Sequence, residues 1–259
     1  MLLTGATGGI GAAIARGFDG RGARLVLSGR RTDMLSALKE ELGGRPEVLT
    51  ADLGAPDGAL ALAAEAGAID VLVANAGLPG TGDLESFSVE EIDRVVNVNL
   101  RTPMQLARAL LPGMRERGRG HIVLVSSISG KIASPHSSVY CATKFGLRGF
   151  GFALHEELRP AGIGVTTIFP GFIREAGMFV DSGAKLMPGM GTSSPREVAE
   201  AVIKGVLKNK AEIDVAPIAM RSGTRLYTLA PTAGAALSRA LGGWKIASSV
   251  AAGQRDKRA

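Results

Sequence analysis

A tyrosine and a lysine four residues apart are the side chains best suited to chemistry in this sequence. Tyr140-Cys141-Ala142-Thr143-Lys144 places a phenol and an ammonium one helical turn apart, on one face of a helix. A free phenol has a pKa near ~10, too high for efficient proton transfer at neutral pH. A lysine cation beside it would stabilise the phenolate and lower that barrier. Because such pairs are also common on protein surfaces, the surrounding residues must decide between the two interpretations.

Two serines lie between an apolar run and this tyrosine. Ile122-Val123-Leu124-Val125 is typical of a buried strand, and Ser126-Ser127 follow it directly. Ser127 stands 13 residues before Tyr140. A hydroxyl at this point could hydrogen-bond a substrate carbonyl oxygen together with the phenol. Ser126 is the competing candidate.

A glycine-rich turn opens the chain. Thr4-Gly5-Ala6-Thr7-Gly8-Gly9-Ile10-Gly11 follows a short apolar run and begins a helical pattern. Glycines there allow backbone to approach a pyrophosphate, and the helix N-terminus offers free N–H groups to the anion. The same turn also fits a plain strand-to-helix connection. Asp52-Leu53 and Asn75-Ala76-Gly77 favour a nucleotide site, because both end predicted strands where open α/β sheets bind ligands.

The end of the second predicted strand bears on the choice of nucleotide. A site for NAD usually has an acidic residue here to hold the ribose hydroxyls, whereas this chain has Gly29 followed by Arg30 and Arg31. A guanidinium suits a 2′-phosphate. We therefore predict that NADP(H) is preferred, with NAD(H) possible. The alternative is that both arginines are solvated charges at a helix start.

Short apolar runs alternate with longer helical patterns along the chain, which predicts βαβ units. The expected fold class is α/β, with a single Rossmann-type doubly wound parallel sheet of about seven strands and helices on both faces. Strands are predicted at residues 1–3, 24–28, 47–50, 69–74, 121–126, 164–169 and 212–216. Ser194-Pro195-Arg196-Glu197 predicts a helix start with a capping box.

Two segments differ from this alternation. Residues 175–194 are rich in Gly, Met and Ser, which is typical of a lid or loop, and Met178, Met187 and Met190 could line an apolar pocket. Pro231 and Gly242-Gly243 should divide the C-terminal segment into short helices. We expect a catalytic and dinucleotide-binding domain at 1–220 and a helical extension at 221–259 that packs on it or is partly disordered. The extension should pack its apolar side chains on the core: Leu226, Leu229, Leu237, Leu241 and Trp244.

Composition limits the class of protein. The 259 residues allow one large α/β domain. The single cysteine, Cys141, excludes an intramolecular disulfide, and only Leu2-Leu3 precede polar and glycine residues, so we expect no signal peptide and a cytoplasmic protein. The histidines at 121, 136 and 155 show no metal-ligand spacing, so no metal site is predicted. His136 could face a substrate.

The charge is unevenly distributed. Residues 1–195 carry 19 basic and 19 acidic side chains, whereas residues 196–259 carry 11 and 5. The basic residues are mostly scattered, so we expect a solvated face and no nucleic-acid partner. Membrane contact through this basic segment is the less favoured alternative.

Taken together, these motifs resemble the short-chain dehydrogenase/reductase family. The resemblance runs from Thr4 to about Gly171, in the family's order and spacing. It rests on the glycine turn, Asp52, Asn75-Ala76-Gly77, Val98-Asn99-Leu100, Ser126-Ser127, Tyr140 with Lys144, and Pro170-Gly171.

The resemblance implies an oxidoreductase that interconverts an alcohol and a ketone or aldehyde. Its catalytic tetrad would be Asn99, Ser127, Tyr140 and Lys144, since the family's spacing favours the second serine. Asn99 would hold a kinked helix and a water connected to Lys144, and Lys144 would also bind the nicotinamide ribose. The cofactor-binding residues implied are Gly5, Thr7, Gly9, Ile10, Gly11, Arg30, Arg31, Asp52, Leu53, Asn75, Ala76, Gly77, Tyr140, Lys144, Pro170, Gly171 and Ile173.

Departures and alternatives remain. Many NADP-using members carry a basic residue where this chain has Gly8, and Glu175 replaces a common threonine near the pyrophosphate. The resemblance also implies a homo-oligomer formed through the helices at 89–111 and 138–158. A non-catalytic NADP-binding regulator on the same fold is the main alternative, and a sugar-nucleotide epimerase or dehydratase is a weaker one. An apolar carbonyl compound is the expected substrate.

Overall fold

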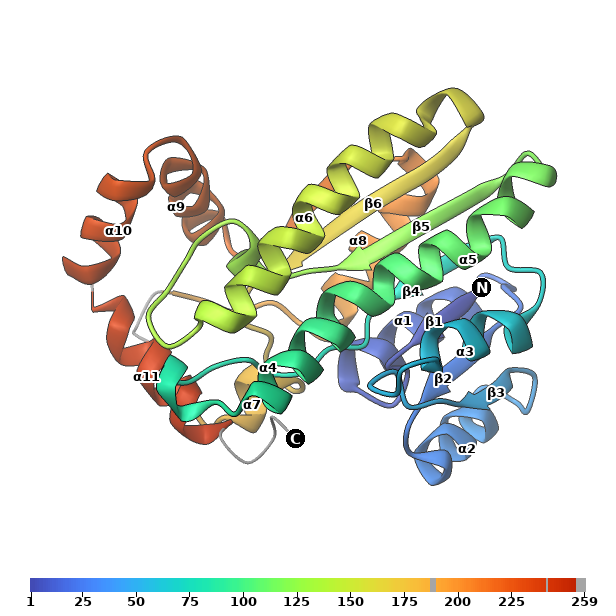
Figure 1. The fold of residues 1–259 in the computed structure, drawn as a ribbon, viewed down its shortest axis with the longest axis horizontal. Helices are drawn as coiled ribbons and strands as arrows, with labels where there is room; N and C mark the ends of the chain where they lie inside the picture. Colours follow the sequence, from blue (N-terminus) through green and yellow to red (C-terminus); the bar gives the residue numbers. More distant parts are fainter. Residues whose placement is uncertain (187–189, 241, 255–259) are drawn as a thin grey trace.

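Seven strands form one parallel sheet in the computed structural model, which describes residues 1–186, 190–240 and 242–254 (Figure 1). The strand order is β3-β2-β1-β4-β5-β6-β7. Within these residues every predicted strand is present and each end lies within two residues of its expected position. The strands are β1 (Leu2–Thr4), β2 (Val26–Gly29), β3 (Glu47–Thr50), β4 (Val71–Ala74), β5 (Gly120–Val125), β6 (Ile163–Pro170) and β7 (Glu212–Val215).

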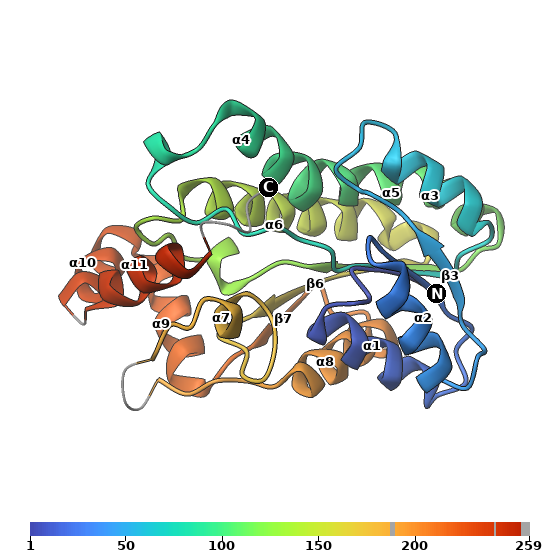
Figure 2. The same ribbon diagram turned by 90° about the horizontal axis from the view of Figure 1, so that it is seen from below.

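Helices cover both faces of the sheet (Figure 2). One layer contains α1 (Gly9–Asp19), α2 (Thr32–Glu41) and α8 (Pro195–Lys208), and the other contains α3 (Gly58–Ala66), α5 (Thr102–Glu116) and α6 (Ser138–Leu158). Helix α4 (Val89–Val96) continues through a π-helical segment (Asn97–Arg101) into α5. Short 3-10 turns occupy Leu84–Ser86, Ile128–Gly130 and Arg159–Ala161. The predicted doubly wound α/β fold is confirmed.

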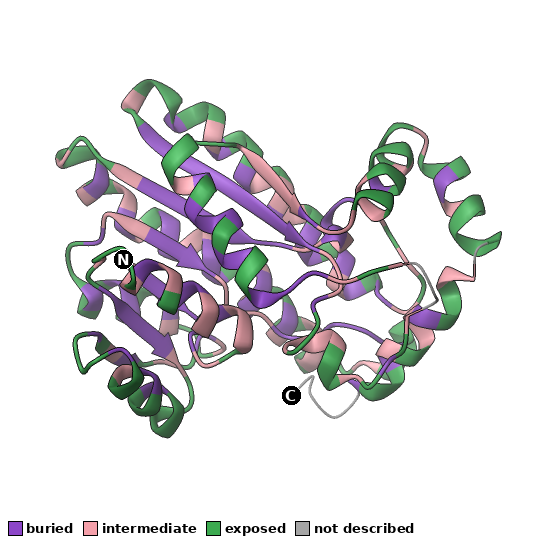
Figure 3. Ribbon diagram, turned by 180° about the vertical axis from the view of Figure 1, so that it is seen from behind, coloured by how far each residue is buried: buried purple, intermediate pink, exposed green. Residues whose placement is uncertain are grey.

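The sheet forms the centre of the core because its strands are covered on both faces (Figure 3). All eight residues of β6 are buried, as are five of the six in β5. This burial explains why β5 is apolar from Ile122 to Val125, whereas β6 also contains two buried threonines, Thr166 and Thr167. The chain winds outward in both directions from β1 and β4, which pair with each other, so their carboxyl ends border the crevice where such sheets bind ligands.

Helix α8 begins as its sequence predicts. The Ser194 hydroxyl accepts a hydrogen bond from the Glu197 amide at 3.1 Å, and the Glu197 carboxylate accepts one from the Ser194 amide at 2.6 Å. Pro195 occupies the first turn, where its missing N–H is not needed.

Three helices follow β7 and form an arm at one end of the molecule (Figure 1). They are α9 (Ile218–Leu229), α10 (Pro231–Ala240) and α11 (Gly243–Gly253), so the breaks occur where Pro231 and Gly242-Gly243 predict them. Helix α9 begins before residue 221, where the extension was expected to start. Among the described helices, none is long and apolar enough to cross a membrane.

The expectation that the apolar side chains of this arm pack on the core is wrong. Leu229 is 85% exposed, and Leu226, Leu237 and Trp244 are 47–50% exposed. Thr224 and Tyr227, three residues apart on α9, take the inward positions, and the Tyr227 hydroxyl donates to the carbonyl oxygen of Ala133 at 3.2 Å. Leu241 lies outside the described residues.

Candidate active site

The glycine turn is crowded where it meets the rest of the cleft. A Cβ on Gly11 would lie 2.2 Å from the Gly5 carbonyl oxygen, and a Cβ on Gly9 would lie 2.1 Å from the Cβ of Ala176. Gly5 adopts a φ of +65°, which L side chains rarely tolerate. The turn therefore needs glycine at these three positions, and it delivers the N-terminus of α1 to the cleft.

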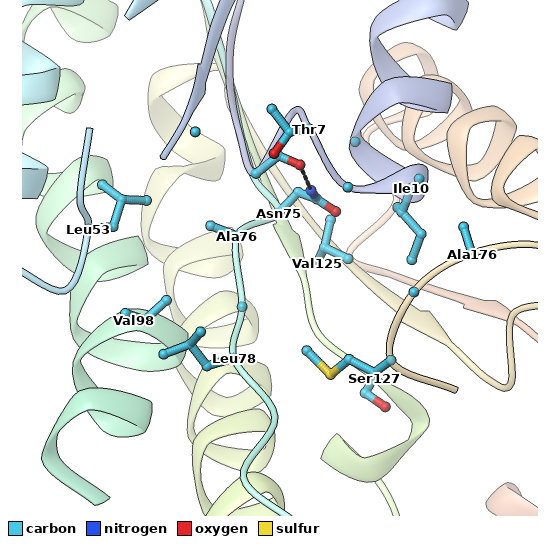
Figure 4. A pocket seen from close by; sticks show the side chains of 18 of the residues that line it. Thr7, Ile10, Leu53, Asn75, Ala76, Leu78, Val98, Val125, Ser127 and Ala176 are labelled. Carbon is cyan, nitrogen blue, oxygen red and sulfur yellow. Dashed lines mark hydrogen bonds between the residues drawn. The ribbon is translucent and has the colours of Figure 1, made fainter. Parts of the chain in front are cut away.

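Asn75 joins the carboxyl ends of β1 and β4. Its side-chain amide donates to the carbonyl oxygens of Thr4 and Gly5, both at 3.1 Å. Figure 4 shows Asn75 beside the glycine turn, with one of these bonds drawn. In return, the Thr4 hydroxyl accepts from the backbone amides of Asn75 and Ala76. These bonds fix the two strand ends that border the crevice.

Three arginines and one carboxylate surround the end of the cleft beside β2 and β3. The Arg31 guanidinium donates to the carbonyl and hydroxyl oxygens of Thr7 at 3.1 and 3.2 Å, and Arg30 beside it is exposed. The Asp52 carboxylate accepts from the Gly54 amide at 2.9 Å and lies 4.0 Å from the Arg94 guanidinium. Sequence reasoning missed Arg94, because only the folded chain brings α4 beside the end of β3.

Ser127, Tyr140 and Lys144 lie together at the other end of the cleft, beside β5 and α6. The Lys144 ammonium donates to the Val125 carbonyl oxygen at 3.1 Å and lies 5.5 Å from the centroid of the Tyr140 ring. The Ser127 hydroxyl is hydrogen-bonded to the Tyr140 phenol. Ser126 also lines the pocket, but its hydroxyl donates to the backbone carbonyl of Lys144 at 3.1 Å.

Burial shifts the pKa of both ionisable groups toward the neutral form. Burial raises the pKa of Tyr140 to about 12, although the Ser127 hydrogen bond acts in the opposite direction. Burial lowers the pKa of Lys144 to about 8. At neutral pH the phenol therefore keeps its proton while Lys144 is still mostly a cation.

Asn99 lies behind the cleft wall. It belongs to the π-helical segment, and its side chain is 1% exposed. This side chain bonds both backbone polar groups of Leu78. The Asn99 amide oxygen accepts from the Leu78 N–H at 2.7 Å, and the amide nitrogen donates to the Leu78 carbonyl at 2.9 Å. Asn99 thus lies in a π-helical interruption between α4 and α5 and fixes the loop that follows Gly77.

One pocket of about 460 Å³ joins these parts, a volume in the range of small-molecule sites. All seventeen predicted cofactor-binding residues line it, together with Ser127; Asn99 does not. Figure 4 shows several of the lining side chains. Residues that the sequence analysis did not single out also line it: Ala51, Gly54, Leu78, Arg94, Ala176, Gly177, Phe179 and Asp181. Leu78 directly follows the Asn75-Ala76-Gly77 motif, a signal that could have indicated it.

The segment after Pro170-Gly171 covers the pocket. Ile173 lies on the pocket wall and forms an isolated bridge with Ser193. Helix α7 (Met178–Asp181) places Met178 in the wall, whereas Met190 does not line it and Met187 lies outside the described residues. Glu175 turns away with a φ of 73° and pairs with Arg174 at 3.1 Å, so its carboxylate does not face the pocket.

The remaining candidates have other partners. His136 pairs with Asp83 at 2.6 Å and does not line the pocket. His121 bonds Thr166 at 2.9 Å, and burial lowers its pKa to about 4. Burial raises the pKa of the Cys141 thiol, as for a packed side chain. Within the described residues no group of His, Cys, Asp and Glu gathers that could hold a metal ion.

A family model for short chain dehydrogenases matches residues 1–186. The chain belongs to the short-chain dehydrogenase/reductase family. It is 36% identical over 250 residues to "Dehydrogenase/reductase SDR family member 7B" of Mus musculus. The aligned region covers 89% of this chain and 77% of that protein. It is also 36% identical over 223 residues to "Ketoacyl reductase HetN" of Nostoc sp., covering 83% and 77%.

A solved structure gives the same result for the fold. The short-chain dehydrogenase from Sphingobium yanoikuyae, crystallised with NADPH, matches with a TM-score of 0.76 and 30% identity, over 82% of this chain and 86% of that one. This short-chain dehydrogenase/reductase is therefore an oxidoreductase on a Rossmann-like sheet, with a cleft of the kind that binds a nicotinamide cofactor.

Proposed function

We propose that the protein reduces a ketone or aldehyde, with Tyr140 as general acid and NADPH as the preferred hydride donor. The observation that carries this proposal is one continuous cleft with Tyr140, Ser127 and Lys144 at one end and Arg30 and Arg31 at the other.

The residues present fit a dinucleotide. The first turn of α1 (Gly9, Ile10 and Gly11) borders the pocket, so its backbone N–H groups would face a pyrophosphate bound there. Arg30 and Arg31 would hold the 2′-phosphate, and Asp52 the adenine end. When bound, the nicotinamide would supply the hydride.

The protein's own groups would manage the substrate oxygen and its proton. The hydroxyls of Ser127 and Tyr140 would hold the carbonyl oxygen, and the protonated phenol would donate its proton to that oxygen as negative charge develops there. The Lys144 cation would stabilise the phenolate that remains. Burial raises the pKa of Tyr140, so the phenol is protonated at neutral pH and has a proton to donate to a substrate oxygen.

Apolar side chains line much of the pocket near the catalytic groups, including Leu78, Val98 and Phe179. We therefore propose an apolar carbonyl substrate. A 3-ketoacyl compound is one candidate, because a relative is named as a ketoacyl reductase.

Two further properties are part of this proposal. The single cysteine, Cys141, suits the reducing cytoplasm. A homo-oligomer formed through α4, α5 and α6 is the expected assembly, and light scattering of the purified protein tests it.

The test of the function is NADPH oxidation with a panel of apolar ketones, 3-ketoacyl thioesters and aldehydes. Turnover that is faster with NADPH than with NADH supports the proposal. Tight NADPH binding without turnover of any of these compounds would favour a non-catalytic NADP-binding regulator.

A further inference from the structure

The side chain of Gln254 is buried at the end of the C-terminal arm. It is 1% exposed, although it directly follows α11 in a segment whose neighbouring helices expose several apolar side chains. Both polar atoms of its amide are occupied by partners far away in the chain. This burial distinguishes Gln254 from the rest of the arm.

The amide oxygen of Gln254 is bonded to the loop that supports the tyrosine. It accepts from the Thr81 hydroxyl at 2.9 Å, and Thr81 is itself 6% exposed. One residue earlier in that loop, the Gly80 carbonyl accepts from the Tyr140 backbone amide at 3.1 Å. This bond therefore joins the arm to the segment beside the catalytic helix.

The amide nitrogen of Gln254 is bonded to α7, which borders the pocket. It donates to the carbonyl oxygen of Met178 at 2.5 Å, and Met178 is the first residue of α7 and lines the pocket. Gly253 packs closely on Ser182, the residue that follows α7: a Cβ on Gly253 would lie 1.9 Å from the Ser182 carbonyl oxygen. The arm thus contacts α7 through Gln254 and the end of α7 through Gly253.

Helix α7 has only four residues, and a single turn has too few internal hydrogen bonds to be stable by itself. Its position depends on outside contacts, among them the packing of Phe179 on Phe172 with ring centroids 4.9 Å apart. Gln254 adds the contact that connects α7 to Thr81.

We propose that Gln254 is a positioning residue that holds α7 over the cleft and thereby sets the width of the substrate entrance. The C-terminal arm is then part of the active-site wall. A glutamine suits this role because one neutral amide donates on one side and accepts on the other. This inference concerns the site of the proposed reductase function. Only the KM measurement below rests on that function, whereas the hydrogen-exchange measurement does not.

The first test is hydrogen exchange in the intact chain, with Gln254→Met as the variant that keeps side-chain volume and removes the amide. The backbone amides of Asp181, Ser182 and Gly183 are hydrogen-bonded within or beside α7. We expect them to exchange about 5- to 30-fold faster in the variant, the equivalent of losing one or two hydrogen bonds, with exchange in α5 unchanged. The exposed residue Ser249 on α11 provides the matched control, Ser249→Ala.

The second test is kinetic. We expect Gln254→Met to raise KM for the carbonyl substrate while kcat stays within about two-fold, because the variant loosens the wall without touching the reacting atoms. Thr81→Val, which removes only the hydroxyl partner, should raise KM in the same direction. Thr81→Ser, which keeps the hydroxyl, should restore wild-type behaviour.

The outcomes separate this inference from the proposed function. Unchanged exchange in α7 of Gln254→Met, or equal acceleration in α7 and α5, would overturn the positioning role. If the wild type turned over no carbonyl compound, the reductase proposal would fail, whereas the exchange experiment would still decide what Gln254 does.

Discussion

The Lys144 ammonium lies 5.5 Å from the centroid of the Tyr140 ring, one turn further along α6. Its side chain is 3% exposed, and its one hydrogen bond described here is to the Val125 carbonyl oxygen, at 3.1 Å. The chain therefore keeps a buried amine beside the phenol, and this arrangement has a cost in stability that depends on pH.

The first prediction concerns that cost. Burial lowers the pKa of Lys144 from 10.5 to about 8. Above pH 10.5 the amine is neutral in both the folded and the unfolded chain, so the cost is absent. The cost grows as pH falls and is complete below about pH 8, so stability is lost over this window. Relative to Lys144→Met, the wild type should gain up to about 3 kcal/mol of unfolding free energy as pH rises across this window. Urea denaturation of both proteins at pH 7 and pH 10.5 measures the difference. A pH-independent difference would contradict the burial of an ionisable amine.

The second prediction concerns the two arginines. Arg30→Asp with Arg31→Asp should move preference from NADP toward NAD, because each acid repels a 2′-phosphate and can accept bonds from ribose hydroxyls. A charge-assisted pair contributes roughly 1.5–3 kcal/mol, or about 10- to 150-fold in affinity. Titrating both cofactors against each protein checks this. A wild type that binds NAD as tightly as NADP would contradict the role given to these arginines.

The third prediction uses the close approach of Gly9 to Ala176. Gly9→Ala should displace the segment that covers the pocket, since the new methyl would lie 2.1 Å from the Ala176 Cβ. Such overpacking costs about 1–3 kcal/mol, equivalent to roughly 5- to 150-fold in NADPH affinity. Gly8→Ala is the matched control, because its Cβ would lie 3.5 Å from the nearest atom.

A second change makes this prediction specific. Ala176→Gly in the Gly9→Ala background removes the opposing methyl and should restore most of the NADPH affinity. Failure of this rescue would mean that the loss arises inside the glycine turn itself.

The fourth prediction concerns the docking of the C-terminal arm. Ile246 is 6% exposed and Leu229 is 85% exposed. Ile246→Ala should weaken the docking of α11 by about 2–5 kcal/mol, whereas Leu229→Ala should have almost no effect. The rate of tryptic cleavage after Lys245, which requires local opening, reports this difference. Equal cleavage rates in the two variants would show that Ile246 does not anchor the arm.

Much of the fold and most of the pocket follow from local patterns. Strands such as β5 and β6 are buried on both faces, so each is rich in apolar residues. Parallel strands also bring their carboxyl ends to one edge of the sheet. Asp52, Asn75 and Ser127 therefore line the same pocket even though they are far apart in the chain.

Other contacts depend on tertiary packing and leave little trace in the sequence. Arg94 approaches Asp52 only because α4 lies beside the end of β3, and Gln254 meets Thr81 across 173 residues. The prediction that the leucines of the arm pack on the core was wrong for a related reason. Helical periodicity shows which side of α9 is apolar, but not that Thr224 and Tyr227 would face inward and leave Leu229 exposed.

The most direct measurement for the central claim is turnover and NADPH binding by Tyr140→Phe. The phenol supplies the proton, whereas most cofactor contacts lie elsewhere in the cleft, so kcat should fall by about 10²- to 10⁴-fold while the Kd for NADPH stays nearly unchanged. A variant that retained more than about a tenth of the wild-type kcat would show that Tyr140 is not the general acid.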